Sequence, residues 1–212
     1  MSADTVTTAQ LIWNSLTESG SEPAIRRQNG NPDQYEVLTG VDAPAEVAAL
    51  WSVLGGRDIL GMNLEGARSA GRLCAARADE AESSRPGTPY PVLDGSADGA
   101  VRMVWWDRGW CPLTATADSA IAVDTHPGVT GRVGQVIYCD FEVYSDREAV
   151  WDCVADFLGD LLVVVSSESL AVEDGFARIP NPEGWDMSVM VAVLEVGRAR
   201  RDGRPVPLLS TA

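Results

Sequence analysis

Three short runs rich in β-branched and aromatic residues occupy positions 100–140, and turn residues separate them. They read AVRMVWW at 100–106, SAIAVD at 119–124 and GRVGQVIYCD at 131–140. Runs of this composition and length are typical of β-strands. The link between the last two runs, THPGVT, is short enough for a hairpin, so we expect these two strands to pair in an antiparallel sheet.

Two segments outside these runs have the pattern of helices. In 43–54, apolar residues recur at helical spacing, and Asp42 and Pro44 suit the start of a helix. In 146–164, a broad apolar stripe follows a capping-box pattern made by Ser145 and Glu148. We therefore expect an α+β fold with a single domain, in which a mostly antiparallel sheet packs against helices.

Weaker patterns cover the rest of the chain. They predict a helix at 7–18, a short strand at 35–38, helical tendency at 62–84 and a hairpin at 169–180, whereas 185–200 could be helix or strand. We expect the domain to span residues 1–180 and residues 181–212 to form a C-terminal extension of unknown role.

The chain of 212 residues is strongly acidic, with a formal net charge of −15. A surface of this charge repels nucleic acid and anionic membranes and attracts basic proteins. We therefore expect a protein partner, with no nucleic acid and no membrane involved. The alternative that the charge only keeps the protein in solution stays open.

The cysteines and the apolar runs favour a cytoplasmic protein. Cys74, Cys111, Cys139 and Cys153 show no C-x-x-C pairing and no histidine at metal-ligand spacing, so we expect four free thiols. The N-terminal residues lack the basic start and apolar run of a secretory leader. Apolar runs such as LLVVV are far too short to span a bilayer.

No sequence pattern indicates catalysis. The only histidine, His126, stands in a turn-like His-Pro-Gly sequence, where an exposed surface role is the simplest expectation. The chain contains no G-x-S-x-G elbow, phosphate-binding loop, dinucleotide fingerprint or calcium loop. A pair of carboxylates for acid–base chemistry stays open, because spacing in sequence does not fix spacing in space. We expect no metal, no cofactor and no enzymatic activity.

The run VWWDRGWCPL places three tryptophans within residues 104–113, and a strand ending in aspartate and a Gly-x-x-Gly-Gln-Val element follow it. This order resembles the SUKH superfamily, and within it the group named for the yeast cell-wall-assembly regulator, over roughly residues 35–165. The matching positions are Trp105, Trp106, Trp110, Pro112, Asp124, Gly131, Gly134, Gln135 and Val136. One departure is TADS at 116–119, where the family usually has a glycine-rich turn.

The resemblance implies a mainly structural role for these matching residues. Because side chains alternate between the faces of a strand, we expect one of Trp105 and Trp106 to face inward and the other outward. The outward ring could instead form part of a partner-binding surface.

The resemblance also implies a function. Bacterial members of the superfamily look like immunity proteins that neutralise a toxin by binding it, and eukaryotic relatives look like signalling adaptors. We expect a non-catalytic binding module that occludes a basic toxin domain, with a cytosolic regulatory adaptor as the alternative. The residues expected to contact the partner are Asp140, Glu142, Asp152, Asp156 and Asp160, the last three on one helix face at i+4 spacing.

Overall fold

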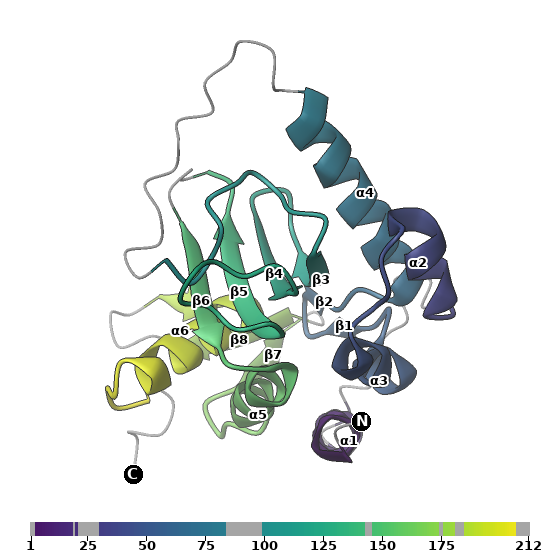
Figure 1. Ribbon diagram of the computed structural model, residues 1–212. Coiled ribbons are helices and arrows are strands. Elements are labelled where there is room, and N and C mark those ends of the chain that lie inside the picture. Colours follow the sequence, from purple (N-terminus) through teal and green to yellow (C-terminus); the bar gives the residue numbers. More distant parts are fainter. Residues whose placement is uncertain are drawn as a thin grey trace.

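The computed structural model describes residues 3–18, 20, 30–83, 99–142, 146–173, 176–180 and 185–206. Its helices are α1 (Ala3–Glu18), α2 (Asp33–Thr39), α3 (Ala45–Leu54), α4 (Ala67–Ser83), α5 (Val154–Val165) and α6 (Val189–Arg201). Its strands are β1 (Asp58–Ile59), β2 (Met62–Asn63), β3 (Trp110–Ala115), β4 (Ser119–Asp124), β5 (Gln135–Asp140), β6 (Arg147–Trp151), β7 (Ala171–Glu173), β8 (Phe176–Pro180) and β9 (Asp186–Met187). The predicted α+β class is confirmed (Figure 1).

A four-stranded antiparallel sheet in the order β3-β4-β5-β6 forms the centre of the molecule (Figure 1). The strand predicted at 119–124 is confirmed as β4, the strand predicted at 131–140 is confirmed from Gln135 onward as β5, and the two pair as the expected hairpin. Helix α4 packs against β3 at one edge, α6 packs against β6 at the other, and α5 contacts β5 and β6. Strand β4 lies between β3 and β5 in the middle of the sheet, and every one of its residues is buried.

The strand predicted at 100–106 is wrong, because this segment is irregular and the strand begins at Trp110. Asp107 holds the chain in a turn before β3. Its carbonyl accepts the N–H of Trp110 at 2.9 Å, and its carboxylate accepts the N–H of Gly109 at 2.8 Å. The pairing of β3 with β4 is irregular between Pro112 and Thr114, as expected at a proline, which has no N–H to donate.

The helix predicted at 146–164 is wrong in its first part. Residues Arg147–Trp151 form β6, which pairs with β5 and completes the sheet, and α5 begins only at Val154. Glu148 of the expected capping box lies within the strand, and Ser145 lies outside the described residues. The spacing of apolar residues in the local sequence carries no information about pairing with β5. That pairing decides the conformation of this segment.

The strand predicted at 35–38 is also wrong, because this segment lies within α2. Tyr35 and Thr39, which are four residues apart, are both buried, and Gly40 ends the helix with a φ of 73°. The helices predicted at 7–18 and 43–54 are confirmed as α1 and α3, although Pro44 rather than Asp42 occupies the N-cap of α3. The helical tendency predicted at 62–84 is confirmed from Ala67 onward as α4, whereas Met62–Asn63 form β2.

The C-terminal segment belongs to the same hydrophobic core. The hairpin predicted at 169–180 is confirmed as β7 and β8, and β9 adds a third strand. The ambiguous segment after it is mainly helix α6, whose Ser188 cap accepts the N–H of Val191 at 3.3 Å. Buried valines of α6 pack into the main core, so this helix belongs to the same packed unit as the sheet. None of the helices in the described ranges is long and apolar enough to cross a membrane.

Candidate functional site

The five carboxylates predicted to contact a partner do not share one surface. Asp140 and Glu142 lie at the end of the sheet where β5 stops, whereas Asp152 follows β6 at the opposite end. Asp156 is exposed on α5, and Asp160 is buried. The predicted acidic face of three helical aspartates is therefore wrong, because Asp152 precedes the helix and Asp160 lies in the core.

Asp160 is a structural residue with a 2% exposed side chain. Its Oδ2 accepts the indole N–H of Trp151 at 2.9 Å, and its Oδ1 lies 2.7 Å from Nε of Arg200. Burial raises the pKa of the Asp160 carboxyl, while the contacts with Trp151 and Arg200 favour its charged form. These two contacts join β6 and α6 to α5, so Asp160 stabilises the fold and is not available to a partner.

Four carboxylates gather where the β3–β4 and β5–β6 connections meet, and we call this region the acidic end. It consists of Asp118, Asp140, Glu142 and Asp146, of which Asp140 is half-buried and the others are exposed. One main-chain bond joins the two connections, and a second closes the β5–β6 connection. The N–H of Phe141 donates to the carbonyl of Asp118 at 2.7 Å, and the N–H of Asp140 donates to that of Asp146 at 2.9 Å. The acidic end is therefore built on hydrogen-bonded turns.

Two arginines near the acidic end stack on Phe141, and one of them, Arg147, is buried. The guanidinium carbons of Arg77 and Arg147 lie 4.3 and 5.0 Å from the ring centroid of Phe141. Arg147 is only 2% exposed and donates to the main-chain carbonyls of Asp140 and Asp146, and burial lowers its pKa. Its cation thus lies beneath the carboxylates, which leaves the exposed surface of this end acidic.

The tryptophan run contributes to the core. Trp110 is fully buried and Trp106 is 5% exposed, and their rings meet edge to face with centroids 5.5 Å apart. Trp105 is partly buried against Phe141, with ring centroids 5.1 Å apart. Trp105 is therefore the more outward of the adjacent pair, and Pro112 is buried in β3.

Asp124 and Gln135 form a buried polar pair at the opposite end of the sheet. The side-chain amide of Gln135 donates to Oδ2 of Asp124 at 3.0 Å and to the carbonyl of Ala100 at 2.8 Å. The N–H of His126 donates to Oδ1 of Asp124 at 2.9 Å. Burial raises the pKa of the Asp124 carboxyl although these bonds favour its charged form. The pair fixes Ala100 to the β4–β5 hairpin.

Two glycines of this hairpin meet different demands. A Cβ at Gly131 would collide with the carbonyl oxygen of Ala100, so the close approach of the two segments requires glycine there. Gly134 has a φ of 91°, a conformation that favours glycine, and its N–H donates to the carbonyl of Asp124 at 2.8 Å.

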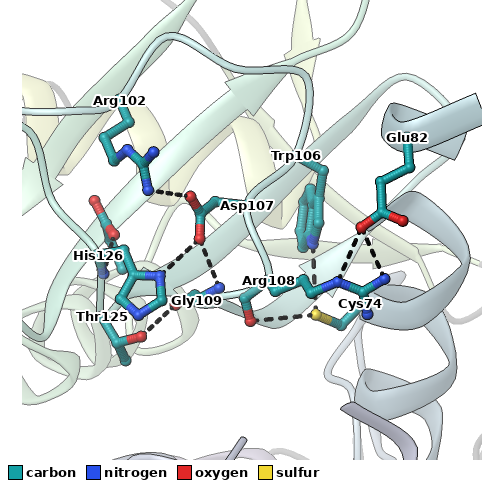
Figure 2. A network of polar contacts seen from close by, with 10 residues as sticks. Cys74, Glu82, Arg102, Trp106, Asp107, Arg108, Gly109, Thr125 and His126 are labelled. Atoms are coloured by element: carbon teal, nitrogen blue, oxygen red, sulfur yellow. Dashed lines mark hydrogen bonds and ion pairs between the residues drawn. The ribbon is translucent and has the colours of Figure 1, made fainter. Parts of the chain in front are cut away.

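Sequence reasoning missed a polar network around Asp107, which Figure 2 shows. Oδ1 of Asp107 lies 2.9 Å from Nδ1 of His126, and Oδ2 lies 2.6 Å from the Arg102 guanidinium. Because an ionised carboxylate only accepts hydrogen bonds, Nδ1 of His126 is the donor to such a carboxylate in this contact. The aspartate and the histidine stand 19 positions apart, and no spacing rule links them.

An oriented imidazole can accept a proton, but catalysis also requires a reacting group beside it. Among the described residues, no hydroxyl or thiol hydrogen-bonds to the His126 ring, and the nearby Thr125 hydroxyl donates to the carbonyl of Gly109 at 2.7 Å. The network joins the turn before β3 to the turn after β4, which is a structural role. Across the described ranges, no three His, Cys, Asp or Glu side chains are grouped so as to hold a metal ion.

A second branch of the network joins the tryptophan run to α4 (Figure 2). The indole N–H of Trp106 donates to Sγ of Cys74 at 3.5 Å, and the Arg108 guanidinium lies 3.0 Å from Glu82. Burial raises the pKa of the Cys74 thiol. All four cysteines are free, so none of these thiols bridges segments covalently.

Comparison with family models and with curated proteins gives no match to this sequence. The α+β fold, the acidic end and the sequence resemblance described above are therefore what indicate its function.

Proposed function

We propose that this protein is a non-catalytic, cytoplasmic binding module that recognises a basic protein and neutralises it by occlusion, as an immunity protein does. The observation that carries the proposal is the acidic end. Its exposed carboxylates lie on connections held by main-chain hydrogen bonds, while the neighbouring Arg147 is buried against Phe141.

Charge of this kind acts mainly on the encounter with a partner. A net charge of −15 steers a basic protein toward the module, and local carboxylates orient it over about 8 Å, the screening length at physiological ionic strength. Because main-chain hydrogen bonds already hold Asp118, Asp140 and Asp146 in place, binding through these residues costs little additional conformational entropy. The acidic end therefore suits fast association with a basic surface.

The proposed partner is a toxin domain that acts on nucleic acid. Such a domain is basic because its substrate is a polyanion, so an acidic protein competes for the same surface. The SUKH resemblance supports this class of partner, and the free thiols support a cytoplasmic site of action.

The test is a titration of a basic toxin domain encoded beside the gene of this protein. The proposal predicts that toxin activity disappears at one molar equivalent and that the two proteins elute together as a 1:1 complex. Inactivation by a small fraction of an equivalent would indicate catalysis and contradict the proposal. Tight binding to a host regulatory protein, with no effect on the toxin, would favour the alternative of a regulatory adaptor.

A further inference from the structure

An open groove of about 510 Å³ lies between α1 and α5, which pack side by side below the sheet (Figure 1). Both helices contribute apolar and polar side chains to it. The lining residues are Leu11, Asn14, Ser15 and Glu18 of α1, together with Leu162, Val163 and Ser166 at the end of α5.

The groove face of α1 is distinct from its core face. Residues 11, 14, 15 and 18 follow helical spacing along one side, while Ala9, Ile12 and Leu16 are buried on the other. Leu11 is nevertheless 49% exposed, and Val163 of the facing helix is only partly buried. The core is complete without these side chains, so the groove presents an apolar floor to solvent.

Gly159 gives a second indication that something packs here. By helical spacing it lies on the same side of α5 as Val163 and Ser166. Glycine weakens a helix relative to alanine, yet a Cβ at Gly159 would meet no heavy atom within 4 Å. Packing within the described chain therefore gives no reason for this glycine, whereas the close approach of another helix would.

Carboxylates flank the apolar floor. Glu18 lies in the groove wall, and the exposed Asp156 stands one turn before Gly159 on α5. No arginine is among the lining residues. The groove thus combines an apolar strip with negative charge, which complements an amphipathic helix whose apolar stripe is bordered by lysine or arginine.

We propose that the α1–α5 groove binds an amphipathic helix of a basic protein partner. The partner's apolar side chains contact Leu11 and Val163, its backbone approaches Gly159, and its cations lie near Glu18 and Asp156. The positive charge of this helix rests on the proposed function, and the groove adds a binding surface separate from the acidic end.

The test uses the full chain and a synthetic helical peptide of about 14 residues, roughly four turns. The peptide carries leucine at i, i+3, i+4 and i+7 and arginine elsewhere, and a second peptide replaces every arginine by glutamate. We expect the double variant Leu11→Ser/Val163→Ser to bind the arginine peptide about tenfold more weakly than the parent. The matched control Val37→Ser changes an exposed valine of α2 and should bind as the parent does.

Gly159→Ala separates docking from folding. The added methyl should raise the midpoint of thermal unfolding by about 2–4 °C, because alanine favours the helix and the space is open. The same variant should bind the arginine peptide roughly threefold more weakly, because the peptide helix can no longer approach α5 as closely. If Gly159 had a purely structural role, its replacement would not give a more stable protein that binds the peptide more weakly.

Equal binding of the arginine peptide by the parent and by Leu11→Ser/Val163→Ser would overturn the groove as the docking site. If the basic toxin domain still binds in that case, the proposed function stands and only the groove is wrong. If the parent binds the glutamate peptide as tightly as the arginine peptide, the assignment of a basic partner helix is wrong. A dimer of the parent alone in sedimentation, dissolved by Leu11→Ser/Val163→Ser, would identify a second copy of this chain as the occupant and overturn the proposal.

Discussion

The side-chain amide of Gln135 donates to the buried carboxylate of Asp124 at 3.0 Å and thereby joins the adjacent ends of β4 and β5. The other carboxylate oxygen accepts the N–H of His126, so both oxygens have donors. Asparagine offers one acceptor oxygen, and its NH₂ group would face a donor. We expect Asp124→Asn to lower the free energy of unfolding by about 1–3 kcal/mol in urea denaturation. A variant as stable as the parent would show that the pair is dispensable.

The same carboxyl predicts a dependence on pH. Because burial raises the pKa of Asp124, the folded protein binds this proton more tightly than the unfolded chain does. The stability from this group is therefore complete below the unfolded pKa of about 3.9 and is lost as pH rises through the folded pKa. Asparagine does not titrate, so the parent's advantage over Asp124→Asn should widen as pH falls from neutral toward that value. An advantage that stays constant in unfolding experiments across this range would contradict the assignment.

Trp110 and Trp105 should differ in their effect on stability. Trp110 is fully buried against Trp106, so Trp110→Ala should cost about 3–5 kcal/mol of unfolding free energy. Trp105 is only partly buried, so Trp105→Ala should cost clearly less. Thermal and chemical denaturation of both variants measures the difference. If Trp110→Ala melts like the parent but no longer binds the partner, Trp110 is an interface residue and its structural role is wrong.

Two aspartates of α5 provide a matched pair. Asp160→Ala leaves the indole N–H of the buried Trp151 without its acceptor and should cost about 1–3 kcal/mol. Asp156→Ala changes an exposed side chain on the same helix and should stay within about 0.5 kcal/mol of the parent. Urea denaturation of the two variants is the measurement. Equal effects would mean that Asp160 is not held in the core.

The sequence predicted the elements that local patterns define. The β4–β5 hairpin follows from two β-branched runs and a short link, and α1 and α3 follow from their apolar spacing. The prediction was wrong where the conformation depends on pairing with another strand or on a turn held by side-chain hydrogen bonds. Strand β6 exists because it pairs with β5, and the turn at Asp107 delays β3 until Trp110.

The candidate site was harder to predict for the same reason. The carboxylates of the acidic end come from two connections that only the antiparallel register brings together, so Asp118 and Asp146 were missed. The i+4 spacing of Asp152, Asp156 and Asp160 suggested one helix face. In the structure Asp152 follows the end of β6, and Asp160 is buried in contact with Trp151. The contact of Asp107 with His126 has no local signal at all.

The kinetics of the acidic end test the central claim most directly. The triple variant Asp118→Asn/Glu142→Gln/Asp146→Asn removes three exposed charges of the acidic end. The control Asp33→Asn/Glu36→Gln/Asp42→Asn removes three exposed charges in and just after α2. Surface plasmon resonance against the neighbouring basic toxin domain, at low and high salt, measures association and dissociation rates for both.

Because the acidic end acts on the encounter, its triple variant should associate about tenfold more slowly at low salt and depend less steeply on salt, while dissociation changes little. The association rate of the control should fall much less, since its charges lie away from the proposed contact. If both triple variants associate at the same rate with the same salt dependence, net charge alone accounts for binding, and the acidic end is not the recognition surface.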